Sequence, residues 1–218
     1  MKYELLNNNK AFLIGNVIEE PIFSHETFGE GFYETKLSVP RLSEHVDILP
    51  VIVSEKMIKN FNLSKDVGIK GQFRSFNKLS GNKNKLILSI FAREIIEIDK
   101  SMNPNIIEIS GFVCKEPIYR LTPFNREICD ILIAVNRAYN KSDYLPCIAW
   151  GRNARYIKEA KIGSKIDIVG RIQSRDYQKK LESGDIITRT AYEISISRVM
   201  LIQDEATANN SLKTAEIE

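Results

Sequence analysis

The chain has 218 residues, 43% of them hydrophobic and 27% charged, and its formal net charge is +3. Because domains usually contain about 100–150 residues, this length predicts two domains. No stretch approaches the roughly 18 uncharged apolar residues of a membrane helix, and the first residues lack the apolar run of a secretory signal, so we expect a cytoplasmic protein that is not embedded in a membrane.

The first half of the chain is expected to form mostly β-strands. Five segments alternate apolar and polar residues or form short apolar runs, and clusters of Gly, Pro, Asn and Ser separate them. These segments are AFLIGNVI, FYETKLSV, DILPVIV, VGIKGQF and KLILSIF. Between the third and the fourth, SEKMIKNF places Met57, Ile58 and Phe61 on one side, which predicts a short helix.

The second half is expected to form the same series of elements. Its predicted strands are IIEISGFV, EICDILIAV, YLPCIAW, SKIDIVGRI and TAYEISISRV. The segment RNARYIKEA lies between the third and the fourth of these strands. It predicts a helix, because Ala154, Ile157 and Ala160 follow one another at helical spacing.

The two halves are also similar in sequence. LIGNVIEEPIF at residues 13–23 matches ISGFVCKEPIY at residues 109–119, so that Gly15 and Gly111 lie 96 residues apart. A repeat of this kind indicates one structural unit present twice. Five strands with one helix between the third and the fourth is the order of an OB-fold, a small Greek-key barrel.

We therefore expect an all-β fold of two tandem five-stranded OB barrels with one short helix in each. The predicted domains are a diverged OB-fold at residues 1–103 and a second OB-fold at residues 104–203, joined near DKSMNPNI at residues 99–106. Residues 204–218 contain few apolar residues and no periodicity, which predicts a disordered tail.

The segment DYLPCIAWGRNARY contains the only tryptophan of the chain, Trp150. Tyr144 precedes it by six residues, so both side chains lie on one face of a continuous strand. Two interpretations remain open: the rings fill a core, or they form a surface on which flat ligands stack. Two arginines follow directly behind the tryptophan, at positions 152 and 155.

The second half resembles the bacterial single-stranded DNA-binding protein (SSB) family over its full length. The resemblance is carried, in order, by ISGFVCKEPIYRLTP, ILIAVNR, DYLPCIAWGRNA, GSKIDIVGRIQSRDY and TAYEISISRV. The first half keeps LIGNVIEEP, KLSVPR and VGIKGQFRSF and resembles the family weakly, as a diverged copy. The family's base-stacking positions fall on Tyr139, Tyr144, Trp150 and Tyr177, whereas the first half has Ser43, Ile48, Ser54 and Lys78 at the equivalent places.

Positive charge is concentrated in the same half as these aromatics. Residues 109–203 contain 16 Lys and Arg against 10 Asp and Glu, whereas residues 1–108 contain 14 of each. Cations near stacking rings bind phosphates and release counterions. The predicted nucleic-acid contacts besides the four rings are Arg137, Arg152, Arg171, Arg175, Lys179 and Lys180.

The leading hypothesis is a sequence-tolerant single-stranded DNA-binding protein of replication, recombination or repair. Two alternatives stay open: an OB-fold adaptor that binds proteins, and a single-stranded RNA-binding protein, because stacking does not distinguish ribose from deoxyribose. The resemblance implies four barrels in the assembly and hence a homodimer. It does not extend to the acidic tip ending in Pro-Phe that recruits other proteins, since the chain ends in SLKTAEIE.

Neither catalysis nor a cofactor is expected. The chain contains no P-loop, G-x-S-x-G or H-E-x-x-H motif, and its two histidines, His25 and His45, have no Ser, Cys or carboxylate pattern beside them. The three cysteines form no C-x-x-C pair and no histidine accompanies them, so we predict buried thiols and no metal site.

Overall fold

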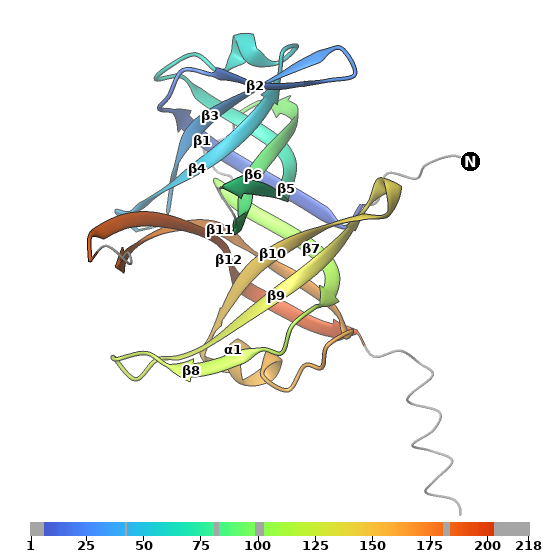
Figure 1. Ribbon diagram of the computed structural model, residues 1–218, viewed down its shortest axis with the longest axis vertical. Helices are drawn as coiled ribbons and strands as arrows, with labels where there is room; N and C mark the ends of the chain where they lie inside the picture. The colour runs from blue at the N-terminus through green and yellow to red at the C-terminus, as the bar shows by residue number, and fades with distance from the viewer. Residues whose placement is uncertain (1–6, 42, 81–82, 99–102, 181–183, 203–218) are drawn as a thin grey trace, which may run out of the picture.

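The structure is a computed structural model that describes residues 7–41, 43–80, 83–98, 103–180 and 184–202. It consists of two tandem OB barrels, one above the other in Figure 1. The elements of the first barrel are β1 (Asn9–Val17), β2 (Ile22–Thr27), β3 (Glu30–Pro40), β4 (Val46–Ser54), a 3₁₀ turn (Ile58–Asn60), β5 (Asp66–Ser80) and β6 (Lys83–Ile96). Those of the second are β7 (Asn105–Val113), β8 (Ile118–Leu121), β9 (Glu127–Arg137), a 3₁₀ turn (Ala138–Asn140), β10 (Lys141–Trp150), α1 (Gly151–Ile157), β11 (Lys165–Lys180) and β12 (Ile186–Ile202).

The predicted fold is confirmed, with two corrections. Each barrel contains a sixth strand, β2 or β8, which the sequence did not reveal because every side chain of these edge strands is exposed and no apolar alternation marks them. The helix expected from SEKMIKNF is a 3₁₀ turn of three residues, Ile58–Asn60. Asn60, Asn62 and Ser64 favour turns over helix, and Ser64 has a φ of 62°.

The pairing of the strands gives the two barrels a matched order. The strands follow one another as β2-β3-β4-β6-β5-β1-β7-β11-β12-β10-β9-β8. The pairs β1–β3 and β7–β9 close the barrels, and the antiparallel pair β1–β7 joins them, with Ala11 opposite Ile107. The second half of this order mirrors the first, so a pseudo-two-fold axis relates the barrels.

The repeated glycines lie where each barrel closes. A Cβ atom on Gly15 would lie 2.8 Å from the carbonyl oxygen of Ser38, and one on Gly111 would lie 2.6 Å from that of Ala134. Contacts this short force the backbone apart. The close approach of β1 to β3 and of β7 to β9 therefore explains why both copies have glycine there.

Replacement of Gly111 with alanine is expected to lower the free energy of unfolding by about 1–3 kcal/mol, because β7 and β9 must separate to admit the methyl group. Urea denaturation measures this loss. Ser110→Ala, at the neighbouring position of β7, is the control and is expected to change stability by less than about 0.5 kcal/mol. Equal losses in the two variants would contradict this explanation.

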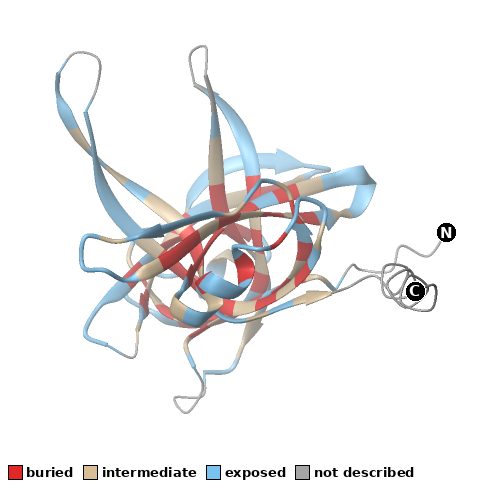
Figure 2. Cartoon of the chain, turned by 90° about the horizontal axis from the view of Figure 1, so that it is seen from below, coloured by how far each residue is buried: buried red, intermediate tan, exposed pale blue. Residues whose placement is uncertain are grey.

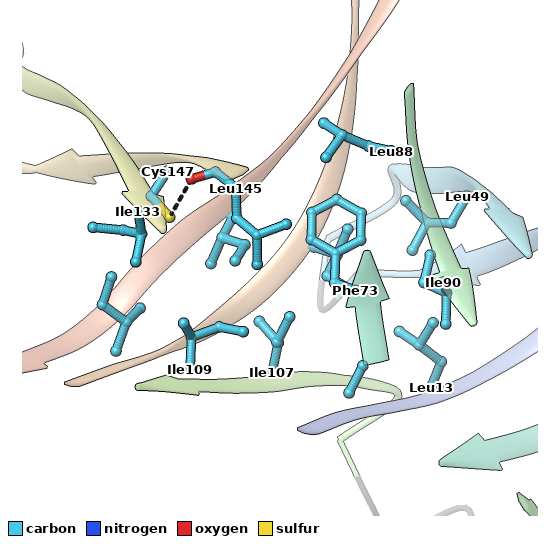
Figure 3. Packing of buried hydrophobic residues seen from close by; sticks show 14 of the residues in the cluster. Leu13, Leu49, Phe73, Leu88, Ile90, Ile107, Ile109, Ile133, Leu145 and Cys147 are labelled. Atoms are coloured by element: carbon cyan, nitrogen blue, oxygen red, sulfur yellow. Dashed lines mark hydrogen bonds between the residues drawn. The ribbon is translucent and has the colours of Figure 1, made fainter. Parts of the chain in front are cut away.

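The buried apolar side chains form one cluster that extends through both barrels (Figure 3). Leu13 and Phe73 come from the first barrel and Ile107 and Leu145 from the second, and all four are fully buried. Figure 2 shows buried residues in the interior and exposed hairpins projecting from it. The domain boundaries near residues 103 and 203 stay predictions, because 99–102 and 203–218, including the predicted tail, lie outside the described residues.

Two matched sets of polar contacts also join the barrels. Asp143 Oδ1 accepts a hydrogen bond from the backbone N–H of Ser75 at 2.8 Å, and the Oγ atom of Ser75 accepts one from the N–H of Tyr144 at 2.7 Å. In the equivalent place, Asp47 Oδ1 accepts from the N–H of Ser174 at 2.8 Å. The two aspartates are fully buried, so each barrel fixes a strand of the other.

Candidate nucleic-acid interface

The four aromatic side chains predicted to stack on bases are all exposed. The exposed fraction is 78% for Tyr139, 44% for Tyr144, 41% for Trp150 and 38% for Tyr177. Tyr144 and Trp150 both lie on β10, where the odd-numbered neighbours between them, such as Leu145, are buried. Ile148 is buried as well, so the alternation is interrupted before Trp150, but Trp150 itself lies at the surface at the end of β10 and the interpretation of this ring as core filling is wrong.

Tyr139 lies in the turn between β9 and β10. The backbone has positive φ angles there, 62° at Tyr139 and 54° at Asn140, which reverses the chain within a few residues. Arg137 precedes the turn, and its Nη1 atom lies 3.3 Å from Oδ1 of the buried Asp143. The turn thus presents the tyrosine at the tip of the hairpin, with a fixed arginine at its base.

Tyr177 lies on the long hairpin of β11 and β12, opposite Arg189. Every side chain from Arg175 to Lys180 is exposed, and the hairpin curves away from the barrel at the left of Figure 1. Because β12 lies between β11 and β10, the structure places Tyr177 across one strand from Tyr144 rather than beside it.

The six predicted cations do not form one patch. Arg152 follows Trp150 in the first turn of α1 and is exposed, as are Lys179 and Lys180 on the hairpin; within the described part of the chain, these three have no ion pair. Arg175 lies 3.6 Å from Glu193. Each of these four stays close in sequence to a predicted stacking ring.

Arg171 lies apart from the other cations. Its Nη2 atom donates to Oε1 of Gln173 at 3.2 Å, and it lines a groove of about 640 Å³ together with Arg41 of the first barrel. Burial lowers the pKa of Arg171, and the charge of Arg41 lowers it further. The sequence placed Arg171 near the aromatics, but the fold turns it toward the boundary between the barrels.

The stacking positions of the first barrel have different surroundings. Ser43 and Lys78 are exposed, Ile48 is 41% exposed and Ser54 is 8% exposed. Trp150 lies opposite Ile128 in the second barrel, whereas Ser54 lies opposite Phe32 in the first. In this cross-strand pair, the aromatic side chain therefore belongs to the third predicted strand in the second barrel and to the second predicted strand in the first barrel.

Sequence reasoning did not identify Phe32, Phe91 and Arg93, which form a cluster with Arg74 on the first barrel. Phe32 packs against Phe91 with their ring centres 5.4 Å apart, and the guanidinium groups of Arg74 and Arg93 lie over the Phe91 ring. No family motif marks these positions. The signal was the segment FARE at residues 91–94, which places a ring and an arginine two residues apart on one strand face.

The described residues contain no group of three His, Cys, Asp or Glu side chains that is arranged to hold a metal ion. Cys129 and Cys147 are buried, as predicted, while Cys114 is partly exposed. Burial raises the pKa of the Cys129 thiol to about 11, so it stays protonated and unreactive near neutral pH. No helix within the described residues is long and apolar enough to cross a membrane.

Comparison with known proteins supports the assignment from the motifs. Residues 104–202 match the single-strand binding protein family. Single-stranded DNA-binding protein 3 of Streptococcus agalactiae is 29% identical over 96 residues, which cover 41% of this chain and 70% of that protein. Single-stranded DNA-binding protein 1 of Lactococcus lactis is 32% identical over 83 residues, covering 35% of this chain and 55% of that one.

The whole fold also has a solved counterpart. The crystal structure of the single-stranded DNA-binding protein from Thermus aquaticus superposes with a TM-score of 0.72 and 16% sequence identity. The match covers 90% of this chain and 93% of that one, and it therefore includes both barrels. At this identity the likeness supports the fold alone.

Proposed function

Because residues 104–202 make this chain a member of the single-strand binding protein family, we propose that it is a sequence-tolerant single-stranded DNA-binding protein acting in DNA replication, recombination or repair. The observation that carries the proposal is the exposure of Tyr139, Tyr144, Trp150 and Tyr177 on one barrel. Every base has a flat face, so stacking on these rings holds a strand of any sequence.

The charge of the second barrel supports the same function. Arg152, Lys179 and Lys180 are exposed near the rings and are available to phosphates. Phosphate contacts on a single strand make log K fall by about 0.7 per contact for each log unit of salt. We therefore expect binding with a marked salt dependence and without a catalytic step.

We propose further that two chains associate into a homodimer of four barrels that acts in the cytoplasm. The family resemblance of the second barrel supports this assembly, and the pseudo-two-fold axis within one chain provides two of the four barrels. Light scattering during gel filtration tests it: a mass twice the 24.9 kDa of one chain supports the homodimer, and the mass of one chain contradicts it.

The single tryptophan allows a direct test of the DNA-binding proposal. Oligo-dT is expected to quench the fluorescence of Trp150 to saturation at low salt, and added salt is expected to restore it. Duplex DNA of the same length is the control and is expected to leave the signal unchanged. Equal quenching by oligo-U would favour the RNA-binding alternative.

Absence of quenching, together with no binding of a labelled oligonucleotide, would overturn the proposal. The tandem barrels would then have to be considered as an adaptor that binds proteins.

A further inference from the structure

The cluster around Phe91 on the first barrel is built from two neighbouring strands. Gln72 of β5 lies opposite Phe91 of β6, and Arg74 follows two residues farther along β5, on the same face of the sheet. Arg93 has no partner across the strands, because the register of β5 and β6 shifts between Lys70 and Gly71, and its guanidinium group lies over the Phe91 ring. The Cζ atoms of Arg74 and Arg93 lie 4.4 and 4.7 Å from the centre of the Phe91 ring. The ring is therefore in cation–π contact with two guanidinium groups.

Gln72 holds these two arginines in place. Its Oε1 atom accepts a hydrogen bond from Nη2 of Arg74 at 2.7 Å and one from Nη2 of Arg93 at 3.4 Å. A guanidinium fixed by a ring and an amide keeps its outer face and its remaining N–H groups available. Planar guanidinium groups stack on bases and donate hydrogen bonds to phosphates.

The cluster carries more positive charge than its carboxylates balance. Neither Arg74 nor Arg93 forms an ion pair in the described ranges of the chain, and Arg137 of the second barrel lies close enough to repel both. Burial, and after it the charges of Arg137 and Arg93, lower the pKa of Arg74 to about 10. Asp143 is a carboxylate that attracts Arg74, but Arg137 already pairs with it, and Glu34 lines the same groove as Arg74. A bound anion would stabilise this arrangement.

Arg74 and Phe91 of the cluster line a groove of about 730 Å³, which we call the Phe91 groove and define by Arg74, Phe76, Phe91 and Arg137. Gln72 and Arg93 line a neighbouring pocket, so that Arg93 lies beside the groove, against the Phe91 ring. Phe76 is 45% exposed. Arg137 comes from the second barrel, where it forms the base of the turn that carries Tyr139. The groove therefore continues from the predicted interface of the second barrel.

The equivalent place of the second barrel has different chemistry. The strand registers align Phe91 with Ser195 and Ser89 with Glu193. Glu193 is 8% exposed, and it accepts a hydrogen bond from Gln173 at 2.8 Å. The barrel fold thus forms with a carboxylate and no ring at this place, so folding alone does not require the arginines and the ring of the first barrel.

We propose that a single strand bound at the second barrel continues into the Phe91 groove, where bases stack on the guanidinium plane of Arg74 and on Phe76. Arg74 in the groove and Arg93 beside it bind the phosphates of this segment. This inference rests on the proposed function and extends it to a barrel that lacks the family's stacking residues. The occupant is the next segment of the same strand, because the groove is continuous with the first site and has the opposite charge.

The test compares two lengths of oligo-dT, since one OB-fold covers about 4–16 nucleotides. The variant is Arg74→Gln combined with Arg93→Gln. For an oligonucleotide of about 10 nucleotides, quenching of Trp150 is expected to give the dissociation constant of the unchanged chain. For one of about 30 nucleotides, we expect roughly tenfold weaker binding and a salt slope smaller by about 1.4, the contribution of two phosphate contacts.

Lys56→Gln combined with Lys59→Gln is the charge-matched control, because it removes two positive charges from the first barrel outside the groove. It is expected to leave the salt slope unchanged, and thermal unfolding verifies that both variants fold.

The arginine variant would overturn the inference if it bound the long oligonucleotide with the affinity and salt slope of the unchanged chain. The proposed function would then remain intact. Equal weakening for both lengths would overturn it too, because the arginines would then belong to the second barrel's site. Failure of the unchanged chain to bind either length is instead a failure of the proposed function.

A second readout locates the strand directly. In a chain carrying Trp150→Phe and Phe76→Trp, the long oligonucleotide is expected to quench the new fluorophore and the short one is not. The substitution is at a half-exposed position, so it introduces little strain. A signal that neither length changes would contradict occupation of the groove.

Discussion

Alanine at Trp150 or at Tyr144 is expected to weaken binding of oligo-dT by roughly 5- to 150-fold for each substitution, because stacking on one aromatic side chain contributes about 1–3 kcal/mol per base. Both rings are more than 40% exposed, so their removal leaves no cavity in the core. The anisotropy of a labelled oligonucleotide measures the affinity without relying on the tryptophan itself.

Tyr156→Ala provides a control of matched exposure. Tyr156 lies on α1 and is 46% exposed, and its hydroxyl accepts a hydrogen bond from the N–H of Leu201 at 3.2 Å. We expect its removal to affect stability slightly and to leave DNA binding unchanged. If all three variants bind equally well, the exposed rings of β10 do not hold the strand.

Local periodicity predicted the strands and the shared face of Tyr144 and Trp150, whereas Tyr139 and Tyr177 were predicted from the family resemblance. Alternation along β10 places Tyr144 and Trp150 on one face, and the structure confirms their exposure. The repeat aligned Gly15 with Gly111 and so predicted two copies of the barrel. It could not show that β1 pairs with β7, since that contact depends on how the barrels dock and not on the pattern within either strand.

The positions of the arginines were less predictable than those of the rings. Arg171 is close to Tyr177 in sequence, but the strand carries it to the boundary with Arg41. Conversely, Arg74 and Phe91 are 17 residues apart and meet because β5 and β6 pair. Which residues become cross-strand neighbours depends on the register of the two strands. The hydrophobic pattern of a single sequence sets the apolar face of a strand but does not show which residue of another strand lies beside an arginine.

The contacts of Asp143 between the barrels give the largest expected effect on stability. The carboxylate is 1% exposed and accepts the N–H of Ser75, while Arg137 pairs with it from a side chain that is 31% exposed. Asp143→Ala leaves that N–H and the guanidinium without their partner. We expect a loss of about 2–3 kcal/mol in the free energy of unfolding, below the 3–5 kcal/mol of a fully buried pair because water reaches Arg137.

Asp143→Asn separates the hydrogen bond from the charge. Burial raises the pKa of Asp143 even though Ser75 and Arg137 oppose the shift, so the site disfavours the charged form and an amide oxygen is expected to be tolerated better than alanine. Because the folded state binds this proton more tightly than the unfolded state, the carboxyl group's contribution to stability rises as the pH falls through its folded pKa. The stability of the unchanged chain relative to Asp143→Asn is therefore expected to rise in acid.

Asp130→Ala is the matched control at the surface. Asp130 is 37% exposed and pairs with Arg120 at 2.8 Å, and an exposed pair of this kind contributes less than about 1 kcal/mol. Urea denaturation of the three variants at two pH values tests the whole argument. If Asp143→Ala lowers the free energy of unfolding no more than Asp130→Ala does, the buried aspartate does not hold the barrels together. The apolar cluster around Phe73 and Ile107 alone then fixes the two barrels on either side of the Phe91 groove.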